Sequence, residues 1–314
     1  MDLINKQFIF ETNDTVAQCH AATVVVLNGN IVASAWFAGS AEGKPDVSIW
    51  FTRCVDGIWE APIMLTANDG IPHWNPVLFS PDGETLTLFY KVGDKIPDWK
   101  TYVMQSYDGG KSWTEANELV LNDTSGGRGP VKNKPIMLAD GKILAPASTE
   151  QGAWRPFVDI LSGEEWHKCS MPVCDSEGLG LFQPTLWTSG NGNVHAMLRS
   201  NKGFIYRSDS CDYGESWSQC YPINIPNNNS GIDCVMVEDK LLLVCNPIEK
   251  NWGERTPLTV FLSNDNGKTF EKLYDLETEN GEFSYPSIVS KGEKAYVVYT
   301  HKRKKIAFCE FKFN

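Results

Sequence analysis

Several features that mark common protein classes are missing from this 314-residue sequence. No apolar stretch reaches the length of a membrane-spanning helix, and residues 1–6 contain no apolar signal-peptide core. The 28 Lys and Arg are outnumbered by 39 Asp and Glu, which gives a formal net charge of −11. We therefore expect a soluble protein that binds neither nucleic acid nor a membrane. Its compartment is unknown: cytoplasmic as the chain reads, secreted or periplasmic if a signal peptide was removed.

Metal-binding and redox patterns are equally sparse. The nine cysteines are scattered and include no C-x-x-C pair, so neither a zinc site nor a disulfide framework is expected. No glycine-rich phosphate loop, H-E-x-x-H or G-x-S-x-G motif occurs. We expect no cofactor, and leave open only a structural Ca²⁺ on loop carboxylates. The short basic run at residues 301–305 lies beside a strand pattern and is interpreted as protection of a sheet edge, without a function.

What the sequence does have is an internal repeat of just over fifty residues. The pattern S-x-D-x-G-x-x-aromatic, known as the Asp box, begins at Ser106, Ser210 and Ser263. Two weaker copies end at Trp59 and Trp166, so that the closing aromatic residues recur at spacings of 54, 53, 51 and 53. Aspartate and glycine suit a tight turn, because Asp bonds its own backbone and Gly accepts positive φ. We expect these boxes to be structural rather than catalytic.

The repeat predicts the architecture. Short strand patterns separated by turn signals fill the intervals between boxes, and no long amphipathic helix occurs. About six such units fit into the chain, and radial repetition of four-stranded sheets hides strand edges. We predict an all-β fold, a six-bladed β-propeller that forms a single domain over residues 1–314. The strand patterns at residues 7–10 and 308–313 are expected to share the last blade and close the ring.

Reactive side chains recur at equivalent phases of the repeats, where inner strands would bring them to the propeller axis. As catalytic candidates we take His20, Glu42, Asp46, Arg199, Arg255 and Tyr285. As substrate-binding candidates we take His73, Asn75, Arg128, Lys132, Lys134, Gln183 and Asp233, and Glu282 lies at the same phase as Tyr285.

These motifs resemble the sialidase superfamily, whose propellers carry Asp boxes. The strand that ends in Arg199 resembles the one with the family's second arginine, and Arg255 lies in a strand similar to that of the third. Tyr285 lies in a segment similar to that of the nucleophilic tyrosine. Glu42 or Asp46 lies in the stretch of the catalytic acid. The resemblance implies a carbohydrate-active enzyme on a sialidase-like propeller.

Two positions depart from the family pattern. His20 stands where the family has its first arginine, and Gln183 stands where it has the glutamate that accompanies the tyrosine. Three arginines clamp the carboxylate of sialic acid through charge-assisted bonds, and the glutamate makes the phenol a competent nucleophile. Their loss argues against ordinary sialic acid hydrolysis.

Two arginines, a histidine and a tyrosine suit another reaction at an acidic sugar. In β-elimination from a uronate, cations neutralise the carboxylate, a base removes the C5 proton and an acid protonates the departing oxygen. His20 could be the base and Tyr285 the acid, or the reverse. By analogy with exo-acting glucuronate lyases on propeller folds, we favour a polysaccharide lyase that acts on an acidic oligosaccharide or polysaccharide.

Two alternatives stay open. One is a sialidase-like exo-glycosidase, with Glu42 or Asp46 as the general acid. The other is a glycan-binding propeller without catalysis, in which tryptophans stack on sugars: Trp74, Trp99, Trp154, Trp187 and Trp252.

Overall fold

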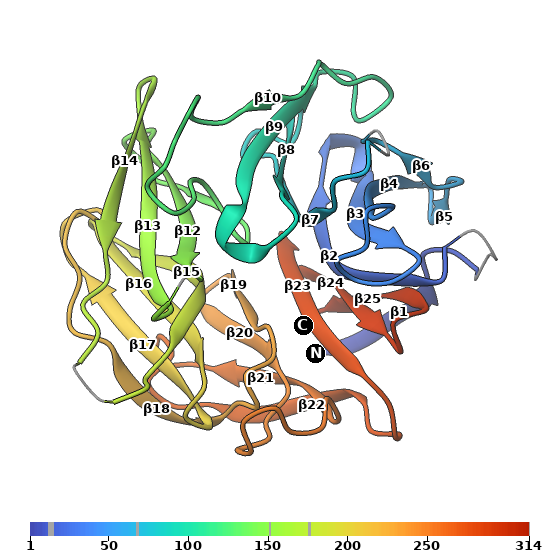
Figure 1. Cartoon of the computed structure of the whole chain (residues 1–314). Coiled ribbons are helices and arrows are strands. Elements are labelled where there is room, and N and C mark those ends of the chain that lie inside the picture. Colours follow the sequence, from blue (N-terminus) through green and yellow to red (C-terminus); the bar gives the residue numbers. More distant parts are fainter. Residues whose placement is uncertain (12–15, 67–68, 151, 175–176, 314) are drawn as a thin grey trace.

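The computed structural model describes the chain except residues 12–15, 67–68, 151, 175–176 and 314. Its described strands form six antiparallel sheets around a central axis (Figure 1). The predicted all-β, six-bladed propeller is confirmed. The described helical elements are two three-residue 3₁₀ turns, η1 (Asn28–Asn30) and η2 (Ile96–Asp98), and none of them could cross a membrane.

The first three sheets follow one another along the chain. The first contains β2 (Gln18–Val26), β3 (Val32–Gly39), β4 (Ser48–Val55) and β5 (Ile58–Trp59), with β6 (Ile63–Met64) also paired to β4. The second contains β7 (His73–Phe79), β8 (Leu86–Val92), β9 (Lys100–Ser106) and β10 (Asn117–Glu118). The third contains β11 (Ile136–Met137), β12 (Ile143–Thr149), β13 (Arg155–Ser162) and β14 (Glu165–Ser170).

The last three sheets complete the ring. The fourth contains β15 (Leu181–Gly190), β16 (Asn193–Ser200), β17 (Phe204–Ser210) and β18 (Tyr221–Pro226). The fifth contains β19 (Asp233–Val237), β20 (Lys240–Cys245), β21 (Leu258–Ser263) and β22 (Glu271–Glu277). The sixth contains β23 (Phe283–Lys291), β24 (Lys294–His301), β25 (Lys305–Lys312) and the N-terminal β1 (Asp2–Phe8).

Pairing of the two ends closes the propeller. β1 runs antiparallel to β25, from Asp2 opposite Lys312 to Phe8 opposite Ala307. The expectation that the end strands share the last blade is therefore confirmed. Closure brings β2 of the first blade into contact with β23 of the last, beside the axis (Figure 1).

Burial falls from the axis outward. Inner strands such as β7 are buried at every residue, whereas outer strands such as β14 and β18 are mostly exposed or half-buried. A strand covered on both faces reads as a continuous apolar run rather than an alternating one, which is the pattern of residues 21–27. The polar side chains that do occur on inner strands are consequently buried.

The box turns are built as their chemistry predicts. Asp108 accepts hydrogen bonds from the backbone of Lys111 and Ser112, and the Ser106 hydroxyl accepts one from Gly110. A Cβ on Gly110 would lie 2.5 Å from Phe51 Cζ, so only glycine lets this turn pack on the preceding blade.

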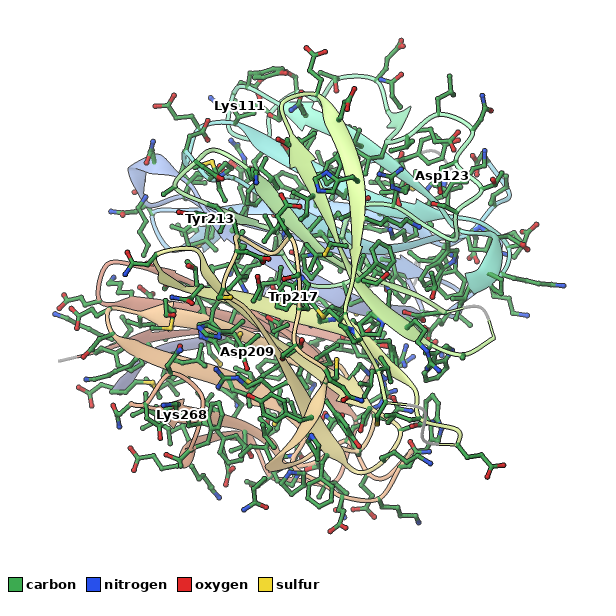
Figure 2. All side chains as sticks on the ribbon, turned by 90° about the vertical axis from the view of Figure 1, so that its left-hand side faces the viewer. Lys111, Asp123, Asp209, Tyr213, Trp217 and Lys268 are labelled. Atoms are coloured by element: carbon green, nitrogen blue, oxygen red, sulfur yellow. The ribbon has the colours of Figure 1, made fainter. Side chains whose placement is uncertain are left out.

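All three turns lie on one face of the propeller. In the side view of Figure 2, Lys111, Tyr213 and Lys268, one from each turn, lie along one side, and Asp123 lies toward the other. Arg199 lies at the end of β16 opposite to Val194, the residue that pairs with the box residue Ser210. The boxes therefore lie away from the candidate site.

Candidate active site

Four inner strands carry a β-bulge at equivalent positions near the axis. The bulges contain Ala21, Asn75, Gln183 and Tyr285, whose φ angles of 53°, 42°, 48° and 54° are unusual for residues other than glycine. A bulge redirects a side chain, and strained backbone of this kind clusters at functional sites. Three of these residues were predicted from the sequence to lie in the site.

Tyr285 is the centre of the cluster. Arg199 Nη1 donates a hydrogen bond to the Tyr285 hydroxyl at 2.9 Å. The guanidinium carbons of Arg199 and Arg255 lie 5.3 and 5.7 Å from the centre of the tyrosine ring. The His20 ring lies against the same ring, with a centroid distance of 4.2 Å. The structure thus brings His20, Arg199, Arg255 and Tyr285 together.

Arg199 is almost fully buried, with 2% of its surface exposed, yet its hydrogen-bond partners are neutral. Its guanidinium donates to Gln183 Oε1 at 2.8 Å and to Asn229 Oδ1 at 3.3 Å, and lies 4.3 Å from the centre of the Phe182 ring. Its Nε has no partner among the described residues. A buried cation without a bonded carboxylate is costly, so Arg199 keeps an unneutralised positive charge beside the Tyr285 hydroxyl.

Gln183 links Arg199 to a carboxyl group that the sequence analysis missed. Gln183 Nε2 donates to Glu150 Oε1 at 3.0 Å, and Ser148 bonds the same oxygen. Burial raises the pKa of Glu150, against the opposing effects of the Gln183 hydrogen bond and the Arg199 charge. The Gln183 amide therefore lies between a buried cation and a half-buried acid, and it hydrogen-bonds both.

His20 is held as a neutral imidazole. Its Nδ1 lies 2.8 Å from the Thr300 hydroxyl, and 2% of its surface is exposed. Burial lowers the pKa of His20 well below its usual value, and four cations lower it further: Arg303, Arg255, Arg199 and Lys132. Because of burial and these neighbouring positive charges, the imidazole of His20 is neutral at neutral pH. One of its ring nitrogens then carries a hydrogen and the other keeps a lone pair that can accept a proton.

Arg303 belongs to this cluster, and the interpretation of residues 301–305 as simple edge protection is corrected here. Arg303 Nε donates to Glu282 Oε1 and Nη1 donates to Glu42 Oε2, both at 2.6 Å. Arg255 Nη1 donates to the same Glu282 oxygen at 2.6 Å. The sequence offered one signal for Arg303, a basic residue in the turn before the last strand. Its neighbours Lys302, Lys304 and Lys305 are also basic, so the sequence alone did not single it out.

The two predicted general acids differ in their surroundings. Glu42 is exposed and forms an ion pair with Arg303 at 2.6 Å. Asp46 accepts hydrogen bonds from the backbone and hydroxyl of Ser40, each at 2.8 Å, and so holds its own loop together.

Lys132 lies at the axis and joins three blades. Its ammonium donates to Asn133 Oδ1 at 2.7 Å, to the Ile232 carbonyl at 3.1 Å and to the Pro286 carbonyl, and it lies 5.9 Å from the centre of the Tyr285 ring. Burial lowers its pKa to about 7.

The remaining predicted cations, Lys134 and Arg128, have carboxylate partners within the fold. Lys134 bonds both carboxylate oxygens of Asp233 at 3.0 Å, so these two candidates neutralise each other. Arg128 makes a two-pronged contact to Asp159, at 2.9 and 3.0 Å. The charges of these groups are therefore neutralised within the fold.

His73 and Asn75 lie on β7, in the blade next to His20. His73 Nδ1 lies 2.6 Å from the Thr66 hydroxyl, and burial lowers its pKa although Asp69 partly opposes this. Asn75 is 5% exposed at its bulge. The structure thus gives His73 a local hydrogen-bond partner and places Asn75 on the strained inner strand.

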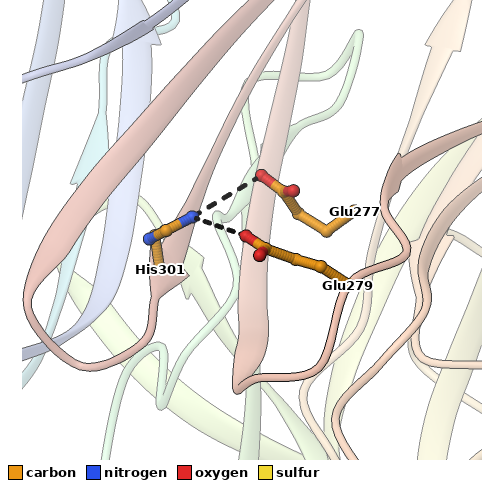
Figure 3. Close-up of side chains that lie close together, drawn as sticks. All are labelled: Glu277, Glu279 and His301. Atoms are coloured by element: carbon orange, nitrogen blue, oxygen red, sulfur yellow. Dashed lines mark ion pairs between the residues drawn. The ribbon is translucent and has the colours of Figure 1, made fainter.

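One described cluster has the composition of a cation site. The ligand atoms of Glu277, Glu279 and His301 lie within 4.8 Å of one another (Figure 3). Tyr299 and Lys6 already contact Glu277, and Lys302 contacts Glu279 at 3.0 Å. Lys6 and Lys302 neutralise these carboxylates, and we assign no metal to the cluster.

Comparisons with known proteins bear on the fold. The family model of the BNR repeat-like domain matches residues 29–298. A crystal structure of a protein of unknown function from Dyadobacter fermentans is similar, with TM-score 0.81, 15% identity, and coverage of 100% of this chain and 99% of that one. No curated protein matches the sequence significantly.

Two structures described as sialidases are also similar. Hadza microbial sialidase Hz136 gives TM-score 0.80 at 16% identity, covering 98% of this chain and 68% of its own. Trypanosoma rangeli sialidase gives 0.75 at 14% identity, covering 98% of this chain and 59% of its own. At such identities the likeness concerns the fold, and the chain spans little more than half of the trypanosomal protein. The chain belongs to the BNR repeat-like domain family and has the sialidase-like six-bladed propeller fold.

Proposed function

We propose that this protein cleaves a glycosidic bond at a carboxylated sugar, by β-elimination at a uronate in the manner of an exo-acting glucuronate lyase. One observation carries the proposal. Among the described residues, the Tyr285 hydroxyl has a guanidinium and not a carboxylate as its hydrogen-bond partner, and a neutral imidazole packs on its ring. This arrangement suits proton transfer by Tyr285 better than nucleophilic attack.

The cations supply the first requirement of the reaction. The charges of Arg199, Arg255 and Arg303 lie close to His20, and those of Arg199 and Arg255 also lie beside the Tyr285 ring. A uronate carboxylate bound by guanidinium groups loses negative charge, which makes the neighbouring C5 proton more acidic and stabilises the carbanion that follows.

His20 is assigned as the base. In the tautomer in which Nδ1–H donates to Thr300, the Nε2 lone pair is free to accept a proton. The low pKa keeps this nitrogen unprotonated throughout the neutral range. Substrate binding has to uncover His20, whose ring is 2% exposed and packs on the partly exposed Tyr285.

Tyr285 is assigned as the acid. Because Arg199 donates to its oxygen, the phenolic hydrogen is left to point at a ligand, and the same guanidinium stabilises the phenolate that forms. His20 takes the C5 proton, the electron pair forms the C4–C5 double bond, the C4–O bond breaks, and the departing oxygen takes the tyrosine proton. Solvent then takes the extra proton from His20 and gives one proton to the Tyr285 phenolate, which restores both side chains.

Hydrolysis is disfavoured by the contacts of the two predicted acids. A glycosidase needs a protonated carboxylic acid to donate to the leaving oxygen. Glu42 is paired to Arg303, and Asp46 binds the backbone and hydroxyl of its own loop. Both carboxyl groups are therefore already engaged in contacts within the fold.

Pure glycan binding is disfavoured by the burial of the tryptophans. Stacking on a sugar needs an exposed ring face, but Trp187 is only 2% exposed and Trp74 only 8%. Trp99 and Trp154 are half-buried, and each packs against another aromatic ring. Trp252, at 64%, is the one of the five candidates with a largely exposed ring. A single exposed ring is a poor platform for a glycan.

The test is the product. An oligosaccharide with a glucuronate substituted at O4 is incubated with the protein, and ultraviolet absorbance reports the unsaturated uronate. His20→Gln and Tyr285→Phe are expected to lower the rate at least about 100-fold, the usual contribution of general acid–base catalysis. His167→Gln and Tyr107→Phe are the matched controls, since His167 is on an exposed ion pair and Tyr107 is 70% exposed.

The alternatives give other results. Release of a saturated sugar without absorbance would contradict the lyase assignment and support hydrolysis. Tight binding with no turnover of any acidic glycan would support the non-catalytic propeller.

A further inference from the structure

We propose that Arg303 and Arg255 form the binding place for the sugar carboxylate, and that the Glu282 carboxylate occupies it until an acidic sugar displaces it. The identity of the ligand rests on the proposed function. The inference adds a specificity-determining arginine from the last blade and an internal carboxylate that competes with the substrate.

The backbone fixes Arg303 beside His20. Lys302 and Arg303 form the turn between β24 and β25, with φ angles of 53° and 58°. The Lys302 amide donates to the Glu282 carbonyl at 2.7 Å, and the Cys19 amide donates to the Arg303 carbonyl at 2.9 Å. The turn is thus tied both to the chain entering β23 and to β2. A guanidinium from the last blade reaches the region where the resemblance to sialidases expects an arginine at position 20.

Glu282 makes the contacts that a bound carboxylate would make. Its Oε1 accepts from Arg255 Nη1 and Arg303 Nε, both at 2.6 Å, and from the Ser284 hydroxyl at 3.2 Å. Burial alone would raise the pKa of Glu282, but the charges and hydrogen bonds of Arg255 and Arg303 lower it, so the side chain is ionised. A single carboxylate oxygen therefore bridges two guanidinium groups.

This pair of arginines is accessible, unlike Arg199. The side chains of Arg255 and Arg303 are 19% and 20% exposed and that of Glu282 is 32% exposed. Glu282 precedes β23 and lies outside any strand, so its side chain can turn away without breaking a sheet hydrogen bond. Glu42, bonded to Arg303 Nη1 at 2.6 Å, would keep Arg303 in place during the exchange.

The experiment measures binding rather than turnover. Glucuronate and glucose, which differ in the carboxylate, are titrated by calorimetry into the full chain and into Arg303→Gln, Arg303→Lys and Glu282→Gln. Charge-assisted hydrogen bonds of this type lead us to expect glucuronate affinity to fall about tenfold or more in Arg303→Gln and less in Arg303→Lys. Glu282→Gln is expected to raise it several-fold, and glucose binding should not change.

Matched controls come from another Arg–Glu pair. Arg53 binds Glu60 through two hydrogen bonds of 2.9 and 2.7 Å on the first blade, so Arg53→Gln and Glu60→Gln should leave glucuronate affinity unchanged. Urea denaturation of every variant shows whether it is folded.

The outcomes separate this inference from the proposed function. A wild-type preference for glucuronate that persists in Arg303→Gln, or a loss of affinity in Glu282→Gln, would overturn the inference alone. If neither the wild type nor Glu282→Gln prefers glucuronate, both fail. The expected binding pattern without an unsaturated product would contradict the lyase step and leave the carboxylate site standing.

Discussion

Replacing Gln183 by glutamate would introduce the residue that the sialidase resemblance expects at this position, and the surroundings of the side chain determine the result. Its carbonyl oxygen accepts from Arg199 Nη1 at 2.8 Å, and its amide nitrogen donates to Glu150 Oε1 at 3.0 Å. In Gln183→Glu the first contact becomes charge-assisted and gains strength. The second becomes a contact between two carboxyl groups.

The second effect is the larger. Two carboxylates 3.0 Å apart repel by about 5 kcal/mol at an effective dielectric constant of about 20. A charge-assisted hydrogen bond exceeds a neutral one by about 1 kcal/mol. The variant can therefore fold at full stability only if Glu150 and the new glutamate share a proton, and the raised pKa of Glu150 already favours this.

The sign of the pH dependence follows. In the folded variant the pair retains a proton that the unfolded chain loses near the ordinary glutamate pKa of about 4.3. The free energy of unfolding is therefore highest below that pH, and it falls as the pH rises, by up to about 1.4 kcal/mol per pH unit. Urea midpoints of the wild type, Gln183→Glu and Gln183→Leu, measured from pH 5 to 9, should show a steeper fall for the glutamate variant than for the other two.

A glutamate variant whose midpoint follows the wild type across this range would refute the reasoning, because Glu150 could not then be a close neighbour of position 183. An equal fall in Gln183→Leu would show that the lost hydrogen bonds, and not the added charge, are responsible.

Two further predictions concern packing and the axis. Gly110→Ala should lower the free energy of unfolding, measured by urea denaturation, by about 1–3 kcal/mol more than Gly57→Ala does. Both glycines have left-handed φ angles, but only a Cβ at position 110 would meet another side chain, that of Phe51. Equal losses in the two variants would contradict the described turn packing. Lys132 has a pKa lowered to about 7 in the fold and about 10.4 when unfolded, so its contribution to stability is present above about pH 10.4 and is lost as the pH falls toward 7. Lys132→Met should flatten the stability curve in this window, and an unchanged slope would argue against a buried, titrating amine.

The architecture could be predicted because its signals are local. Each box turn is specified within eight residues, and the spacing of the closing aromatics, compared with the chain length, gives about six blades without any knowledge of contacts. The same repeat singled out Tyr285, which lies on the inner strand β23, and Arg199, which lies near the end of β16, the strand next to the inner strand of its blade. Phase along a repeat thus predicts which residues reach the axis.

Partners across the axis could not be predicted in this way. Lys134 and Asp233 lie 99 residues apart and were expected to contact substrate separately, yet they bind each other. Arg303 meets Glu42 only because β1 and β25 close the ring, and Glu150 carries no motif that marks it as a neighbour of Gln183. Whether a charge is free or neutralised depends on such long-range contacts, which a single sequence does not contain.

The central claim, cleavage by elimination at Tyr285 and His20, is tested most directly by the fate of the water oxygen. The acidic oligosaccharide is digested in ¹⁸O-labelled water, and the masses of the products are measured by mass spectrometry early in the reaction. Elimination predicts products whose masses sum to that of the substrate, one of them unsaturated, with no label gained during cleavage. Products heavier in sum by one labelled water would show hydrolysis and contradict the account.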